Sequence, residues 1–189
     1  MLSLRRNIEE ENFNKLLDIC FCVSSYVTFT QNRWGNADNH NKFLNEIKPF
    51  YLKTIKTKDW YCMHVPSNNP LEVYVYKADE RVKLIIQKYY DNLFFREGIV
   101  DKPLSISDEE VIREYFDDFT MENLKESDIW GNVKDLPEDI CFFIEDKLFL
   151  GTVSHENICD VYVPSEEIKK QLLKLGEWDV GNKEEFVKI

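Results

Sequence analysis

Residues 138–163 read EDICFFIEDKLFLGTVSHENICDVYV, and this stretch decides the fold. It contains three apolar runs that are rich in β-branched and aromatic residues, at Ile140–Ile144, Leu148–Val153 and Ile158–Val163. Runs of this length, bounded by polar turn residues, are typical of β-strands. The connections between them are too short for a crossover, so neighbouring strands must be antiparallel. The stretch therefore predicts a three-stranded antiparallel meander.

The segments before the meander predict helices and two further strands. Apolar residues keep helical spacing from Ile8 to about Thr30, and again between residues 43 and 55. Short aromatic and β-branched runs at Trp60–Val65 and Glu72–Lys77 predict strands that a turn-rich loop joins. Asp79 is a helix cap for a segment that extends to about residue 95.

Two serines mark the start of further helices. Ser107 and Glu110 have the spacing of a capping box, and Ser165 precedes the apolar residues of a last helix. Helices and hairpins are grouped along the chain and do not alternate, which is typical of α+β proteins. We expect a single globular domain over residues 1–189, with an antiparallel sheet of about five strands that packs against about five helices.

Negative charge is concentrated in one quarter of the chain. Residues 101–146, here called the acidic block, contain fifteen Asp or Glu and four Lys or Arg. The net charge of the block is −11, which equals that of the whole chain, because the other 143 residues hold 20 acids and 20 bases. Folding of a hydrophobic core does not require charge to be segregated in this way. The acidic block is therefore a clue to the kind of molecule that the surface of the protein contacts.

Part of the acidic block has helical spacing. Acids recur every four residues after Ser107, while the opposite side of the same segment is apolar, so the acids are expected to be exposed. Each pair of like charges at this spacing destabilises a helix by roughly a few tenths of a kcal/mol. An aromatic side chain near the block could anchor a partner. The residues predicted to bind a partner are Glu110, Glu114, Asp117, Asp118, Glu122, Asp128 and Trp130.

In size and charge the chain resembles bacterial immunity proteins against nuclease toxins, antitoxins and inhibitors that mimic nucleic acid. The resemblance implies a non-catalytic protein with a basic protein partner, such as a nuclease toxin. Direct binding of nucleic acid is not expected, because phosphate affinity requires clusters of Lys and Arg. The alternative hypothesis is a generic interaction domain whose acidity serves solubility only.

Motifs for common enzyme classes are missing from the sequence. All six glycines are isolated, so no glycine-rich phosphate loop and no serine-hydrolase elbow is present. We therefore expect no cofactor and no catalytic residues. The odd number of cysteines, five, and the lack of a signal sequence or a long apolar segment predict reduced thiols in a cytoplasmic protein without a membrane segment.

An alternative hypothesis concerns four residues that bind metals or act in catalysis in other proteins. Cys62 and His64 are two apart in a predicted strand, so their side chains share a face. His155 and Cys159 flank the last turn of the meander. If these strands were neighbours, the four residues would form a zinc site or a Cys/His-dependent active site. Without such convergence they are separate buried thiols and hydrogen-bonded histidines.

Overall fold

The computed structural model describes residues 1–30, 37–66, 68, 70–94 and 136–181. Residues 1–95 and 135–189 form one compact unit. Residues 96–134, which include the helix predicted after Ser107, lie outside the described residues. The single domain over residues 1–189 therefore stays a prediction, and the fold below is that of the first unit.

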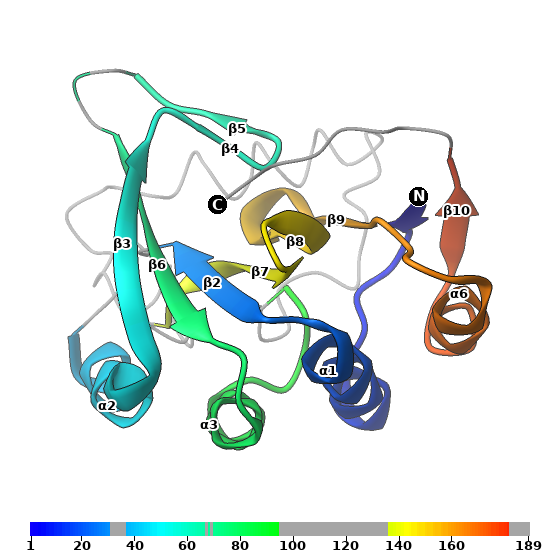
Figure 1. Ribbon diagram of the computed structural model, residues 1–189, viewed down its shortest axis with the longest axis horizontal. Coiled ribbons are helices and arrows are strands. Elements are labelled where there is room, and N and C mark those ends of the chain that lie inside the picture. The colour runs from blue at the N-terminus through cyan, green and yellow to red at the C-terminus, as the bar shows by residue number, and fades with distance from the viewer. Residues whose placement is uncertain (31–36, 67, 69, 95–135, 182–189) are drawn as a thin grey trace, which may run out of the picture. The chain divides into compact units, whose positions relative to one another are not determined.

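The α+β class and the antiparallel sheet are confirmed, and the sheet is larger than predicted (Figure 1). Its eight strands lie in the order β10-β1-β9-β8-β7-β2-β6-β3, and every neighbouring pair is antiparallel. The strands are β1 (Leu2–Leu4), β2 (Tyr26–Thr30), β3 (Tyr51–Thr57), β6 (Leu71–Lys77), β7 (Glu138–Ile144), β8 (Lys147–Val153), β9 (Ile158–Val161) and β10 (Trp178–Val180). A separate hairpin consists of β4 (Asp59–Trp60) and β5 (Met63–His64).

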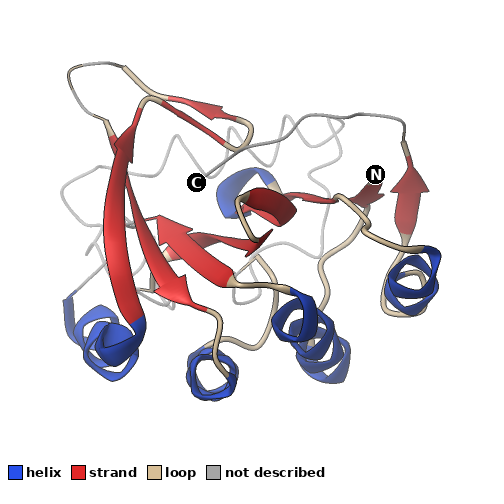
Figure 2. Cartoon of the chain, in the orientation of Figure 1, coloured by secondary structure: helices blue, strands red, loops and turns tan. Residues whose placement is uncertain are grey.

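Four α-helices in the described part of the chain lie on one side of the sheet (Figures 1 and 2). They are α1 (Glu10–Val23), α2 (Ala37–Ile47), α3 (Glu80–Tyr89) and α6 (Glu166–Leu172), with short 3-10 helices η1 (Lys48–Phe50) and η2 (Ser154–Glu156). Asp79 and Ser165 cap α3 and α6 as predicted, because each side chain accepts a hydrogen bond from a backbone N–H of the first turn. No helix within the described ranges is long and apolar enough to cross a membrane.

The predicted meander is confirmed as β7, β8 and β9. Glu145 and Asp146 form the turn between β7 and β8, and Glu145 has a positive φ of 56°. In the second pairing, Gly151 lies opposite Asp160 and Val153 lies opposite Ile158. The η2 helix and Asn157, whose φ is 55°, close this second connection.

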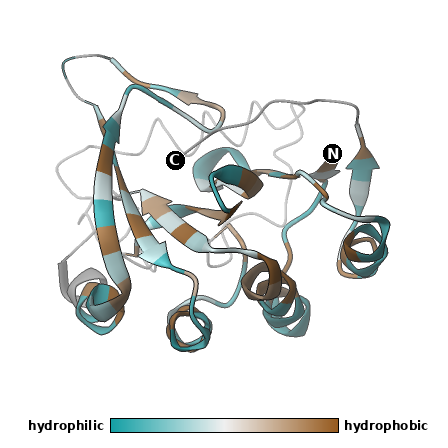
Figure 3. Ribbon diagram, in the orientation of Figure 1, coloured by the Kyte–Doolittle hydropathy of each residue, from teal (hydrophilic) through white to brown (hydrophobic). Residues whose placement is uncertain are grey.

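Two strands lie in segments that the sequence predicted to be helical. The first helix ends at Val23, and Ser24 is already extended at its C-cap. The following residues of β2 are β-branched or aromatic and lie between β6 and β7, where this residue type packs well. Pro49 lies in η1, and β3 follows with exposed residues at 51–53 and a mixture of half-buried and exposed residues at 54–57. Figure 3 shows hydrophilic and hydrophobic bands along this strand. For β2, burial between two strands thus outweighs the weaker helical spacing, whereas β3 pairs with β6 at the edge of the sheet.

The sheet has a hydrophobic core on each face, and β7 contributes to both. Ile140 and Phe142 belong to the larger cluster, which includes buried residues of α1 and α3. Cys141 and Phe143 belong to the smaller cluster, which includes Trp60 and Tyr61 of the β4–β5 hairpin. A strand that is buried on both faces explains why its sequence is almost continuously apolar.

The hairpin is held against the sheet by Tyr61. Its hydroxyl donates a hydrogen bond of 2.7 Å to Oδ2 of Asp160, and its ring covers Gly151 on the adjacent strand. A Cβ atom added at Gly151 would lie 2.8 Å from two ring carbons of Tyr61. Glycine at this position therefore leaves room for the aromatic ring.

Gly151→Ala is expected to destabilise the protein by about 1–3 kcal/mol, because the methyl group overpacks against the Tyr61 ring. Urea denaturation measures this change in the free energy of unfolding. Gly181→Ala is the matched control, since its Cβ would meet only the flexible end of Met1 at 3.2 Å. In a Tyr61→Ala background the cost of Gly151→Ala should fall by at least half. An equal cost in both backgrounds would contradict the packing of the ring on this glycine.

Candidate functional site

The predicted partner-binding residues lie outside the described part of the chain. These are Glu110, Glu114, Asp117, Asp118, Glu122, Asp128 and Trp130. Four acids of the acidic block are described, at positions 138, 139, 145 and 146. Glu145 and Asp146 are exposed in the β7–β8 turn, Glu138 is half-buried and Asp139 is buried.

The four residues of the Cys/His hypothesis do not form one site. Cys62 is exposed in the turn of the β4–β5 hairpin, and Nδ1 of His64 lies 2.6 Å from Oδ1 of Asp59. Cys159 is buried in the helix-side core, whereas His155 lies on η2 with 54% of its side chain exposed. Among the described residues, one group of three has ligand atoms within 4.8 Å of one another, and it contains only His155 of these four.

The buried cysteines are poorly suited to nucleophilic chemistry. Burial raises the pKa of the Cys141 thiol to about 12, and it also raises the pKa values of Cys20 and Cys159. The thiolate is the reactive form of cysteine, so these three side chains are inert at neutral pH. They are packing residues of the two cores.

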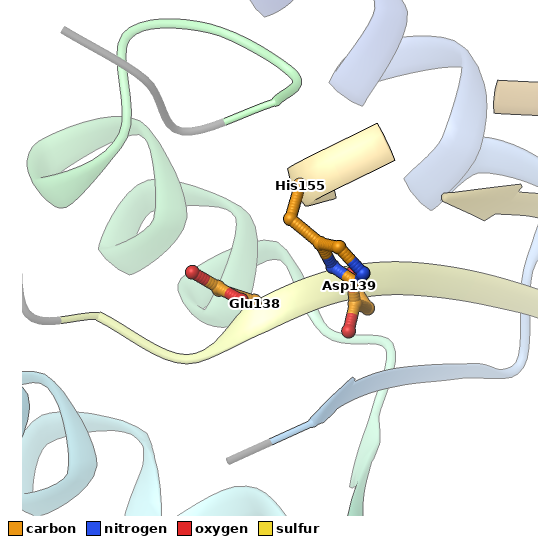
Figure 4. A group of neighbouring side chains, drawn as sticks. All are labelled: Glu138, Asp139 and His155. Carbon is orange, nitrogen blue, oxygen red and sulfur yellow. The ribbon is translucent and has the colours of Figure 1, made fainter. Parts of the chain in front are cut away.

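The group that does converge consists of Glu138, Asp139 and His155 (Figure 4). The first two residues begin β7, and His155 lies in the η2 connection after β8. One carboxylate oxygen of each acid and one ring nitrogen of His155 lie within 4.8 Å of one another. Figure 4 shows the imidazole beside the Asp139 carboxylate.

A β-bulge brings the two carboxylates together. Between the pairs Thr28–Cys141 and Thr30–Glu138, β7 has one residue more than β2. Asp139 lies in this extra space and has a φ of 53°, in the left-handed region that Asp tolerates better than most residues. Consecutive side chains of a regular strand point to opposite faces, and a bulge disrupts this alternation. Glu138 and Asp139 can therefore both approach His155.

Asp139 is held by three buried hydrogen bonds. The hydroxyl of Thr30 donates to Oδ2 at 2.6 Å, and the backbone N–H of Ser154 donates to Oδ1 at 2.8 Å. The backbone N–H of Asp139 in turn donates to the Ser154 hydroxyl at 3.2 Å. The carboxylate thus connects β2, β7 and η2 at a point where only 3% of Asp139 is exposed.

Burial is the dominant electrostatic effect on Asp139. Desolvation raises the pKa of its carboxyl group, although Thr30, Ser154 and the charge of His155 act in the opposite direction. A buried carboxyl group that keeps an elevated pKa against such donors is in an environment that penalises its negative charge. The site can therefore hold a proton or a cation.

Sequence reasoning identified His155 but did not connect it with Glu138 and Asp139. The charge pattern of the sequence places the two acids in the acidic block and gives them no separate role. The sequence does contain a signal for this group: a pair of acids at the start of an apolar strand, together with a histidine in the turn that follows the next strand. In an antiparallel hairpin these two positions are at the same end of the sheet. The bulge that completes the arrangement has no signature in the sequence.

Comparison with known proteins gives no match. No protein-family model matches the chain, and no curated protein or solved structure is significantly similar to it.

Asp139→Ala is expected to destabilise the protein by about 2–5 kcal/mol, because it leaves the Thr30 hydroxyl and the Ser154 N–H buried without an acceptor. Asp139→Asn should cost about 1 kcal/mol, since the amide keeps one acceptor and tolerates a positive φ. Asp146→Ala, in the exposed turn, is the control and should change stability by less than about 0.5 kcal/mol. Chemical denaturation ranks the three variants, and equal costs for Ala and Asn at position 139 would refute the role of its hydrogen bonds.

The native protein should present two reactive thiols to Ellman's reagent. Cys22 and Cys62 are exposed, whereas Cys20, Cys141 and Cys159 are buried. Buried thiols react only when the protein unfolds, so all five should react in denaturant. Rapid labelling of a third thiol would show that one of the buried cysteines is accessible and would revive the Cys/His hypothesis.

Proposed function

We propose that this chain is a non-catalytic binding protein whose acidic surface docks on a basic protein partner. The observation that carries the proposal is the segregation of charge in the sequence. The acidic block has fifteen acids and four bases, whereas the rest of the chain is balanced. A nuclease toxin is the partner class that this chemistry fits best, because its cleft for phosphates must be basic.

Electrostatics explains why such a block suits an inhibitor. Clustered carboxylates attract a basic surface over a distance of about 10 Å at 0.1 M salt and raise the rate of association. The same charge repels nucleic acid, so the protein would compete with the nucleic acid for the partner and would not bind it directly. This is the mode of action of immunity proteins and antitoxins that the resemblance in size and charge implies.

The described end of the acidic block offers a preorganised pair of charges. Glu145 and Asp146 form the turn of the β7–β8 hairpin, and both flanking strands lie inside the eight-stranded sheet. Charges on a rigid turn lose little conformational freedom on binding, which favours affinity. Location in the cytoplasm is part of the proposal, and the five free thiols support it.

A Cys/His-dependent enzyme has less support. Of its four residues, Cys159 is buried with a raised pKa, and His64 lies beside Asp59 on an exposed hairpin. Cys159 is therefore not a reactive thiolate at neutral pH, and the four residues do not gather into one site.

The test is binding to a panel of basic nucleases, measured by surface plasmon resonance at about 0.05 M and 0.3 M salt. For a nuclease that binds, the Glu145→Lys/Asp146→Lys and Glu114→Lys/Asp118→Lys variants should each reduce the association rate about tenfold or more. Glu166→Lys/Glu167→Lys on α6 changes the charge equally outside the acidic block and should reduce it less than about twofold.

The same experiment defines what would overturn the proposal. Absence of binding across the panel, or equal effects of all three variant pairs, would show that the acidic block does not recognise a basic partner. If the three variant pairs have equal effects on the association rate, the acidic block has no special role in binding and its acidity serves solubility alone.

A further inference from the structure

The group at the start of β7 differs from the exposed acids of the acidic block because it combines two carboxylates with an imidazole. The three side chains come from two segments that are 16 residues apart, and their ligand atoms lie within 4.8 Å of one another. Two ligands of one ion, each at about 2.0–2.2 Å, are at most about 4.4 Å apart. The 4.8 Å limit is close to this value, so small rotations of the half-buried Glu138 and the largely exposed His155 suffice to bring their ligand atoms to one ion.

The negative charge of Asp139 lacks a strong cationic partner in the described structure. The carboxylate is buried, and the charged group that acts favourably on it is the imidazole of His155. No Lys or Arg among the described residues is within ion-pair distance of it. Buried charges in proteins are paired or coordinate metals, because an isolated one costs several kcal/mol (roughly).

The surroundings of Asp139 have the character of a second coordination shell. The Thr30 hydroxyl and the Ser154 N–H each occupy one lone pair of a different carboxylate oxygen. Each oxygen keeps a second lone pair for an ion. Hydrogen bonds of this kind fix the orientation of ligating carboxylates in known metal sites.

We propose that Glu138, Asp139 and His155 bind a divalent first-row transition ion. Imidazole together with carboxylates suits Mn²⁺, Fe²⁺ or Zn²⁺, whereas Ca²⁺ and Mg²⁺ prefer oxygen ligands alone. Three protein ligands at an accessible position leave room for water or for a group of a partner. The ion would join the start of β7 to the η2 connection. The inference does not depend on the proposed function, because it requires no protein partner.

Mn²⁺ is the probe, since it binds thiols weakly and the exposed Cys22 and Cys62 will not compete. The purified full chain, free of any affinity tag, is titrated with Mn²⁺ while the loss of the free-ion electron paramagnetic resonance signal is recorded. One ion per chain is expected. His155→Gln and Glu138→Gln should each weaken binding about tenfold or more, which is the scale on which changes near metal ligands act.

Matched controls separate this site from general attraction to an acidic protein. His64→Gln removes another exposed imidazole next to a carboxylate, and Glu145→Gln removes an exposed acid of the same block. Both should bind Mn²⁺ within about twofold of the unmodified chain. A melting curve without metal verifies that each variant is folded, and Zn²⁺ should displace Mn²⁺ from the site.

Two results would overturn the inference. One is the absence of saturable binding of either Mn²⁺ or Zn²⁺ to the folded chain. The other is binding that the two control variants weaken as much as His155→Gln and Glu138→Gln do, since this would reflect the net charge of the protein.

Discussion

The pairing of β2 with β7 is the constraint on which the rest of the described fold depends. On one side of this pair lie β6 and β3, and on the other lie β8, β9, β1 and β10. Residues 26–30 must therefore find residues 138–144, more than one hundred positions away in the sequence. Closing so long a loop costs conformational entropy. The apolar side chains of β7, which are buried on both faces of the sheet, supply the free energy that offsets this cost. The eight-stranded sheet is continuous only because this one junction forms.

The junction also contains a β-bulge, and this bulge creates the polar site. The register between β2 and β7 shifts by one residue at Asp139. The Thr30 hydroxyl and the Ser154 N–H then fix the displaced residue through its carboxylate. A buried polar contact of this kind adds little net stability, but a slip by one residue would leave its donors unpaired. Asp139 therefore acts mainly to specify the register in which the two halves of the sheet meet.

Local sequence signals predicted the elements that depend on local contacts. The prediction of the meander is confirmed, because its two connections are short and its strands are apolar. The predicted caps at Asp79 and Ser165 are also confirmed, because each side chain binds an N–H group of its own helix. The helical predictions for Tyr26–Thr30 and Tyr51–Thr57 are wrong, because Val27 and Ile55 also continue a helical spacing. Only their positions beside β7 and β6 make them strands. For the same reason the sequence pointed to His155 alone, since the backbone of Asp139 depends on a strand that is distant in sequence.

The structure divides the described acids of the acidic block into two kinds. Glu145 and Asp146 are exposed in a turn, so their charge reaches solvent and any partner that approaches. The charge of Asp139 is enclosed by Thr30, Ser154 and His155, which compensate part of it locally. Charge that is compensated inside the fold contributes less to long-range attraction than charge at the surface. The attraction of a basic partner that we propose would therefore rest on the exposed acids of the block, whereas the carboxylate of Asp139 connects β2, β7 and η2.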